Sequence, residues 1–141
     1  MKWLLDADVL SQPAKRRGHP GVIAWLEAHE AQCYTSAIVI AQLAYWVRGK
    51  EGRERTELQA WLRELVDSLE GRIIGFNVAL AHVWAEQKHQ LEAAGLPMPV
   101  EDSLIAATAR RHGLIVASGN DRHFRRPGIK VFNPFKELPV P

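Results

Sequence analysis

Short apolar runs of strand length alternate with longer segments of helical character along the chain, and this alternation constrains the fold more than any other sequence feature. Four runs have the length and composition of buried strands, at residues 2–5, 72–75, 114–117 and 130–132, and residues 33–35 add a strand stub. Strands that are apolar throughout are typical of parallel sheets covered by helices on both faces. The sequence therefore predicts an α/β fold with a central parallel sheet of four to five short strands.

The segments between these strands have helical periodicity or helix-capping residues. The clearest helix covers residues 51–69, where five apolar residues recur at helical spacing: Leu58, Leu62, Leu65, Val66 and Leu69. Residues 38–40 are β-branched and would suit a strand, but a good N-cap at Ser36 and a good C-cap at Gly49 favour a buried helix between them. Further helices are predicted at residues 21–30, 78–94 and 103–112.

Length and composition fit one domain. The chain has 141 residues, against about 100–200 for a typical domain, so we expect a single domain over residues 1–141. The single cysteine, Cys33, excludes a disulfide within the chain and a cysteine-based zinc site, and it suggests a reducing compartment. Asp6 interrupts the first apolar run, so no signal-peptide core or membrane span is expected. These features predict a cytoplasmic protein with no membrane partner.

Acidic and amide side chains stand at the ends of predicted strands. Asp6 ends the first strand, and Asn120 follows the strand at residues 114–117. Asp102 lies just before the small-residue helix at residues 103–112. Ligands bind beyond the carboxyl ends of strands in open parallel sheets. Asp6 and Asn120 therefore belong at one edge if their strands are neighbours, and Asp102 joins them if its helix packs over that edge.

Carboxylates gathered in this way favour a hard divalent cation, because the cation removes their mutual repulsion. Mg²⁺ prefers oxygen ligands and usually takes one or two protein carboxylates directly. Such a site can hydrolyse phosphodiesters. Structural alternatives remain open: an N-cap of a short helix for Asp8, a helix cap for Glu101 or Asp102, and a turn for Asn120 and Asp121. Asp6 is the hardest to explain structurally, because an acid directly after an apolar strand is poorly placed for solvation.

Five segments occur in an order and spacing that identify a family. Residues 4–11 read Leu-Leu-Asp-Ala-Asp-Val-Leu-Ser, and residues 41–45 read Ala-Gln-Leu-Ala-Tyr. Residues 102–109 read Asp-Ser-Leu-Ile-Ala-Ala-Thr-Ala, residues 118–124 read Ser-Gly-Asn-Asp-Arg-His-Phe, and an Asn-Pro pair follows the last predicted strand. The chain thereby resembles the PIN-domain ribonucleases, and among them the VapC toxins of type II toxin–antitoxin systems.

This resemblance implies a three-layer α/β/α PIN-like domain and a metal-dependent endoribonuclease toxin of a VapBC-type module. The implied cofactor is Mg²⁺ or Mn²⁺. The implied partners are an RNA substrate, with tRNA among the candidates, a VapB-type antitoxin and a second copy of the chain in a homodimer. Carried over by position, the catalytic residues are Asp6, Gln42, Asp102 and Asn120, with Asp6 and Asp102 as metal ligands. The accessory candidates are Asp8, Glu101, Ser118 and Asp121.

Two positions depart from the family's pattern. Gln42 stands where the family has its second acid. Its amide can offer an oxygen to a metal but carries no charge and cannot act as a general base. Either the nuclease is weak, or one of the acids at positions 8, 101 and 121 compensates, or the sequence was altered to disarm a toxin. The alternative function is a catalytically impaired PIN-like module that binds RNA or an antitoxin without turnover. His123 replaces a usual Asp, and it either contacts RNA phosphate or packs beside Phe124.

The formal net charge is +2, which is compatible with a nucleic-acid ligand but does not demand one. Basic residues follow the ends of the predicted strands at residues 2–5 and 114–117. Because Lys and Arg supply most of the affinity for phosphate backbones, we expect these residues to form an RNA-binding rim around the acids. The predicted RNA-binding residues are Lys15, Arg16, Arg17, Arg122 and Arg125. The alternative is that they are ordinary solvated charges.

Overall fold

The computed structural model describes residues 1–137, and its centre is a five-stranded parallel sheet. The strands are β1 (Trp3–Leu5), β2 (Cys33–Ser36), β3 (Ile73–Ile74), β4 (Ile115–Ala117) and β5 (Val131–Phe132). Their order is β3-β2-β1-β4-β5, and every neighbouring pair is parallel. The chain builds outwards from β1 in one direction and later in the other, which makes the carboxyl end of β1 the topological switch point. The predicted α/β fold with a central parallel sheet is confirmed.

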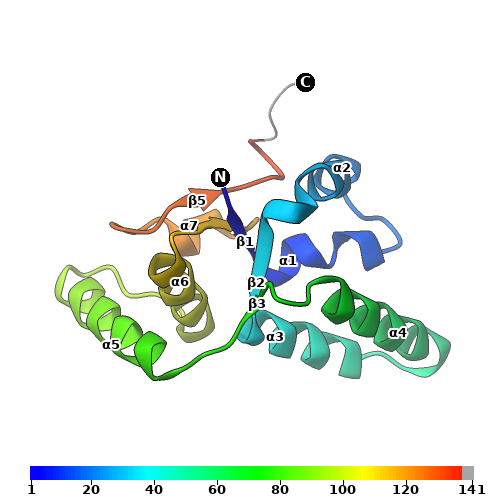
Figure 1. Ribbon diagram of the computed structural model, residues 1–141, viewed down its shortest axis with the longest axis horizontal. Helices are drawn as coiled ribbons and strands as arrows, with labels where there is room; N and C mark the ends of the chain where they lie inside the picture. The colour runs from blue at the N-terminus through cyan, green and yellow to red at the C-terminus, as the bar shows by residue number, and fades with distance from the viewer. Residues whose placement is uncertain (138–141) are drawn as a thin grey trace.

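Helices cover both faces of this sheet. The α-helices are α1 (Ala7–Leu10), α2 (Pro20–His29), α3 (Ala37–Arg48), α4 (Gly52–Ser68), α5 (Val78–Ala93), α6 (Val100–His112) and α7 (Asp121–Phe124). Two short 3-10 helices, η1 (Gln12–Ala14) and η2 (Glu30–Gln32), complete the set. Figure 1 shows α5 and α6 on one side of the strands and α3 and α4 on the other. This is the predicted three-layer α/β/α arrangement.

Helix α3 forms although its first turn is β-branched. The Ser36 hydroxyl accepts a hydrogen bond from the Val39 amide at 3.2 Å, as an N-cap does. Val39, Leu43 and Val47 are buried along one face. Capping and burial of this face outweigh the strand propensity of residues 38–40, since tertiary packing supplies most of a helix's stability.

Helix α6 starts earlier than predicted, and the structural alternatives for Asp8 and for residues 120–121 differ from the observed structure. Helix α6 begins at Val100, three residues before the predicted start, and Pro99 is its N-cap. Glu101 and Asp102 therefore lie inside the first turn, and neither caps the helix. Asp6, not Asp8, caps α1, because the Asp6 Oδ1 atom accepts from the Ala7 amide at 2.8 Å. Residues 121–124 form α7 in place of the turn that was the structural alternative.

The core is formed by the central strands and the helices that pack on them. Leu4 and Leu5 of β1 are almost fully buried, and Ile105 and Ala106 of α6 are completely buried. Full burial of a leucine or isoleucine side chain contributes about 1.5–3 kcal/mol. This packing fixes the end of β1 deep in the molecule, so the next residue, Asp6, is only 4% exposed. Among the helices of residues 1–137, none is long and apolar enough to cross a membrane.

Candidate active site

A cavity of about 820 Å³ opens at the carboxyl end of β1 and is lined by residues from five parts of the fold. The end of β1, the start of α1, helix α3, the first turn of α6 and the loop after β4 all contribute. We call it the acidic cavity. Its polar lining residues are Asp6, Asp8, Gln42, Glu101, Asp102 and Asn120. The four positions predicted as catalytic, Asp6, Gln42, Asp102 and Asn120, thus surround one space, while their chemical roles remain predictions.

Asp6 is held by a hydrogen bond to each carboxylate oxygen. Its Oδ1 accepts from the Ala7 amide at 2.8 Å, and its Oδ2 accepts from the Ser118 hydroxyl at 2.8 Å. The buried Ser118 oxygen accepts in turn from the Asn120 amide at 2.9 Å. Burial, with the added repulsion of Asp8, raises the pKa of Asp6 to about 6 despite these bonds. Asp6 is therefore a rigid and electrostatically strained carboxylate.

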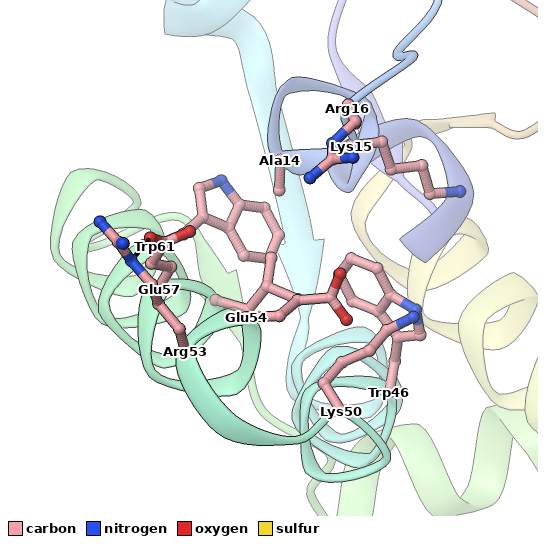
Figure 2. Close-up of a pocket in the computed structure, with 10 residues that line it drawn as sticks. Ala14, Lys15, Arg16, Trp46, Lys50, Arg53, Glu54, Glu57 and Trp61 are labelled. Atoms are coloured by element: carbon pink, nitrogen blue, oxygen red, sulfur yellow. Dashed lines mark hydrogen bonds and ion pairs between the residues drawn. The ribbon is translucent and has the colours of Figure 1, made fainter.

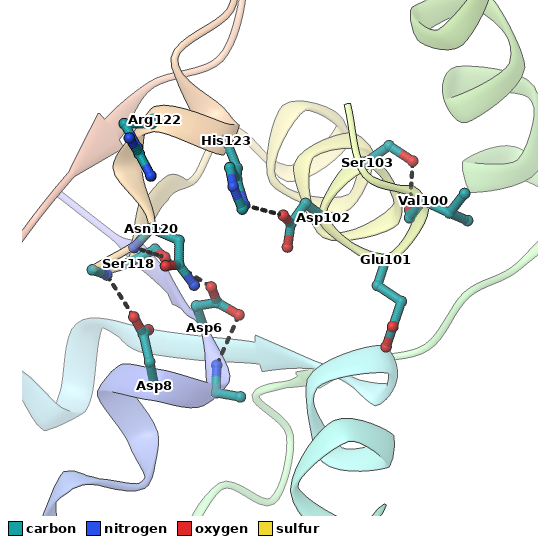
Figure 3. A network of polar contacts seen from close by, with 12 residues as sticks. Asp6, Asp8, Val100, Glu101, Asp102, Ser103, Ser118, Asn120, Arg122 and His123 are labelled. Atoms are coloured by element: carbon teal, nitrogen blue, oxygen red, sulfur yellow. Dashed lines mark hydrogen bonds and ion pairs between the residues drawn. The ribbon is translucent and has the colours of Figure 1, made fainter. Parts of the chain in front are cut away.

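Asp8 is tied to the loop after β4 by one oxygen only. Its Oδ2 accepts from the Gly119 amide at 2.8 Å, as Figure 3 shows. Its Oδ1 is buried and has no hydrogen-bond partner among residues 1–137. Burial raises the pKa of Asp8 as well. Gly119 is required here, because a Cβ atom at this position would lie 2.6 Å from Asp8 Oδ2 and 3.0 Å from the Phe135 ring.

Asp102 faces the cavity from the first turn of α6 and is paired with His123. The Asp102 Oδ2 and His123 Nδ1 atoms are 2.9 Å apart, and the imidazole is 44% exposed. Nδ1 must carry the proton to donate to the carboxylate. Burial raises the pKa of Asp102, although the hydrogen bond and charge of His123 oppose the shift. Figure 3 shows this pair on the side of the cavity opposite Asp8.

Gln42 and Glu101 join α3 to the first turn of α6. The Gln42 Nε2 atom donates to Glu101 Oε1 at 3.2 Å. This bond fixes the amide orientation, since the opposite orientation would set an oxygen against the carboxylate. The Gln42 Oε1 atom is consequently left buried, with no hydrogen-bond partner in the described part of the chain.

The donor set of the acidic cavity fits a hard divalent cation. Apart from Tyr45, its polar lining consists of carboxylates and side-chain amides, and two of their oxygens, Asp8 Oδ1 and Gln42 Oε1, are buried with no hydrogen-bond partner among residues 1–137. Burial is the main cause that raises the pKa of Asp6, Asp8 and Asp102, and a cation between these carboxylates would favour their ionised forms. No three His, Cys, Asp or Glu side chains in residues 1–137 converge as a complete metal cage. The set therefore suits an ion such as Mg²⁺, which keeps several of its waters.

Some predicted residues lie outside this cavity. Asp121 is turned away from it, because its carboxylate binds the Arg125 guanidinium at 3.1 Å and the Asn133 amide at 3.1 Å. Arg125 is engaged by this bond and by Glu137 at 3.4 Å. Arg122 is exposed beside Asn120 (Figure 3). The basic residues of the first loop, Lys15, Arg16 and Arg17, are exposed.

Two residues of the site were not predicted as such. His123 pairs with Asp102, whereas the sequence singled it out only as a departure from the family's pattern, with contact to RNA phosphate or packing beside Phe124 as the alternatives. Tyr45 lines the acidic cavity and is 83% exposed. Its signal was the helical spacing of three residues from Gln42, which puts both side chains on the same face of α3.

Comparison with known proteins agrees with this geometry. The chain is 31% identical over 136 residues to a VapC ribonuclease of Sinorhizobium fredii, covering 94% of this chain and 97% of the relative. It is 31% identical over 137 residues to the toxin FitB of Neisseria gonorrhoeae, covering 95% and 99%. A crystal structure of FitAcB from N. gonorrhoeae superposes with a TM-score of 0.89 at 31% identity, covering 95% of this chain and 99% of that one. The sequence model of the PIN domain matches residues 3–130, and the chain therefore belongs to the PIN domain family.

Proposed function

We propose that this protein is the endoribonuclease toxin of a VapBC-type toxin–antitoxin module, and that it cleaves RNA phosphodiester bonds in the acidic cavity with Mg²⁺ or Mn²⁺. One observation carries the proposal. Asp6, Asp102 and two buried oxygens that have no hydrogen-bond partner among residues 1–137, those of Asp8 and Gln42, surround one cavity at the topological switch point of a PIN domain. The similarity to a protein named VapC ribonuclease supports the choice of RNA as the substrate.

The residues of the cavity divide into those that would hold the metal and those that hold these ligands in place. Asp6 and Asp102 would be the carboxylate ligands, with Gln42 Oε1 as a neutral oxygen donor. A divalent ion bound there would activate water and neutralise charge on the phosphate. Ser118 fixes the Asp6 carboxylate, and His123 fixes that of Asp102. Asn120 lies at the open edge, where its side chain can donate to a phosphate oxygen.

Partner binding is proposed on two grounds. A structure of FitAB bound to a DNA fragment contains a chain that superposes on this one with a TM-score of 0.88 at 28% identity, which supports a VapB-type antitoxin as the protein partner. Exposed apolar side chains at the starts of α5 and α6, Val78 and Val100, which are 74% and 60% exposed, support a homodimer.

Metal-dependent cleavage of labelled RNA by the purified protein tests the proposal. Cleavage should require Mg²⁺ or Mn²⁺ and should be lost in Asp102→Asn, because the substitution removes a carboxylate ligand. Asp67→Asn is the matched control, since Asp67 is an exposed acid near the end of α4 and does not line the acidic cavity. Cleavage that persists in a chelator, or in Asp102→Asn, would contradict the mechanism.

A second candidate function is a catalytically impaired module that binds RNA or an antitoxin without turnover. The observation that favours it is the neutral amide of Gln42 in the acidic cavity, which cannot accept a proton from water. Calorimetry that detects Mn²⁺ binding, together with RNA binding and no cleavage, would support this function over the first.

A further inference from the structure

A second groove, which we call the basic groove, lies between the loop after η1 and the first half of α4. Its volume is about 850 Å³, similar to that of the acidic cavity. Figure 2 shows Lys15 and Arg16 on one wall and side chains of α3, α4 and the residues between them on the other. These opposing residues are Trp46, Lys50, Arg53, Glu54, Glu57 and Trp61.

The charge of the basic groove is positive and largely uncompensated. Lys15, Arg16 and Lys50 form no ion pair with any of residues 1–137. The Arg53 guanidinium is bound to Glu57 at 3.0 Å, so these two charges offset each other. Glu54 is the remaining acid of the lining. Three free cations against one acid favour an anionic ligand with several separated charges, such as a phosphate backbone.

Aromatic side chains accompany these cations. The ring centroids of Trp46 and Trp61 are 6.3 Å apart with planes at 89°, so one ring meets the other by its edge. The Lys50 Nζ atom lies 5.4 Å from the Trp46 ring centroid. Both indoles are partly exposed. Cations beside partly exposed aromatic rings are typical of proteins that bind single-stranded nucleic acid, since bases stack on the rings while phosphates contact the cations.

The wall that carries Lys15 and Arg16 is held in a fixed conformation. The Gln12 side chain donates to the Asp8 carbonyl at 2.8 Å and accepts from the His19 amide at 2.9 Å. Gly18 packs so closely that a Cβ atom there would lie 2.1 Å from the Gln12 carbonyl oxygen. The loop is therefore preorganised, which reduces the entropy lost on binding a ligand.

The basic groove and the acidic cavity each share lining residues with one smaller pocket. Tyr45 lines the acidic cavity, and together with Trp46 and Lys50 it also lines a smaller pocket of about 390 Å³. Trp46 and Lys50 belong in turn to the basic groove. An RNA strand whose cleaved phosphodiester lies beside Asp6 could therefore continue over Tyr45 into the basic groove.

We propose that the basic groove binds a single-stranded segment of the RNA next to the cleaved phosphodiester. Its phosphates would lie against Lys15, Arg16 and Lys50, and one base would stack on Trp46. Glu54 disfavours a phosphate at its own position and accepts a hydrogen bond from a base amine or a 2′-hydroxyl. This inference rests on the proposed function, because it extends the binding site of that substrate.

Binding of a labelled single-stranded oligoribonucleotide, measured by fluorescence anisotropy in a chelator to prevent cleavage, tests the groove. Arg16→Ala and Lys50→Ala should each weaken binding several-fold at low salt. Each should also reduce the slope of log affinity against log salt by about 0.7, the value for one phosphate contact on a single strand. Lys88→Ala is the matched control, because Lys88 Nζ lies 5.7 Å from the Trp84 ring on α5, outside the groove.

Cleavage by the wild-type protein is measured in parallel, so that the two hypotheses can fail separately. If the wild type cleaves RNA and the double variant of Arg16 and Lys50 binds RNA as tightly as the wild type, the groove inference is wrong while the nuclease stands. If the wild type neither binds nor cleaves RNA, both are wrong. Weakened binding of a protein partner with unchanged RNA affinity would also overturn the inference.

Photochemical cross-linking gives a second measurement that needs no variant. RNA containing thiouridine should cross-link to peptides that contain Trp46 or Lys50. Cross-links confined to α5 or to the C-terminal end of α6 would contradict the proposed path of the RNA. Circular dichroism of the variants checks the fold, which should be retained because Arg16 is exposed and Lys50 lies outside the hydrophobic core.

Discussion

Ionisation of the buried Asp6 carboxyl lowers the free energy of unfolding of the metal-free protein, and a substitution can test this effect. The pKa of Asp6 is raised from 3.8 to about 6 in the folded state, chiefly by burial. Between these values the folded state holds a proton that the unfolded state has lost, so the free energy of unfolding falls as pH rises through this window. Asp6→Asn should therefore stabilise the metal-free protein by about 2 kcal/mol near pH 8, allowing for a weakened bond to Ser118.

Thermal denaturation in a chelator measures this effect. The melting temperature of Asp6→Asn should exceed that of the wild type by a few degrees near pH 8 and should equal it below the ordinary aspartate pKa. Added Mg²⁺ should stabilise the wild type and leave the variant unchanged. Asp67→Asn, on the exposed face of α4, should show none of this. A stability gain that persists in acid would mean that the ionised carboxylate is not its source.

Substitution of Gln42 by Glu should lower the stability of the metal-free protein but raise its affinity for metal. In Gln42→Glu, a second carboxylate would face Glu101 where the amide now donates at 3.2 Å. The metal-free variant should lose on the order of 1 kcal/mol of stability through this repulsion, while its Mn²⁺ affinity and cleavage rate should each rise at least tenfold.

Calorimetry, denaturation and cleavage assays on the same preparation separate these effects. Gln59→Glu on α4 is the control, since Gln59 is exposed and lies outside the acidic cavity. Glu101→Gln combined with Gln42→Glu should restore the lost stability. A cleavage rate that does not change in Gln42→Glu would show that another acid already acts as the base.

At the residue scale, the sequence predicted which acids share a cavity better than it predicted their contacts. Asp6 and Asn120 could be placed together because the carboxyl ends of neighbouring parallel strands meet at one edge. Asp121 could not be placed, since its orientation depends on Asn133, which lies in a different part of the chain. The pairing of His123 with Asp102 likewise depends on how α7 packs against α6.

At the scale of elements, polar contacts between α5 and α6 hold Ser103, and we expect them to help position the adjacent Asp102. The Trp84 indole donates to the Ser103 hydroxyl at 2.8 Å, and the buried Gln87 amide donates to the Ser103 carbonyl at 3.0 Å. Both bonds hold the residue next to Asp102. Trp84→Phe should remove one donor with little loss of packing, lowering stability by about 1 kcal/mol and Mn²⁺ affinity a few-fold.

Calorimetric titration of Mn²⁺ into Trp84→Phe measures this positioning role. Val83→Ala, also on α5, is a control that perturbs packing without touching Ser103 through a hydrogen bond. Equal metal affinity in Trp84→Phe and wild type, with stability lowered, would show that the backbone of α6 fixes Asp102 without help from α5.

The long helices and the strands were predictable, whereas the short helices were not. Residues 51–69 were predicted as a helix and Gly52–Ser68 forms one, because its periodicity extends over several turns. Helices α1 and α7 have four residues each, too few to show a period or to be stable alone. They form because tertiary contacts hold them, such as Ser118 on Asp6 and Asn133 on Asp121.

At the scale of the whole molecule, Cys33 allows a test of whether the chain unfolds as one unit. It is the only cysteine, it is 2% exposed, and it lies in β2 in register with Trp3 of β1. Burial raises the pKa of its thiol to about 12, although Arg72 opposes the shift. A protonated and inaccessible thiol should react with a disulfide reagent only when the structure opens.

The core around Cys33 includes residues of β1, α2, α6 and β4, so an opening large enough to expose the thiol should disrupt the central sheet itself. The free energy of opening, obtained from labelling rates in low denaturant, should then equal the free energy of unfolding obtained from tryptophan fluorescence. Labelling in Asp6→Asn should slow by the factor that corresponds to its stability gain near pH 8. A smaller opening energy, unaffected by Asp6→Asn, would instead indicate that α2 and β2 detach locally and that the chain is not one cooperative domain.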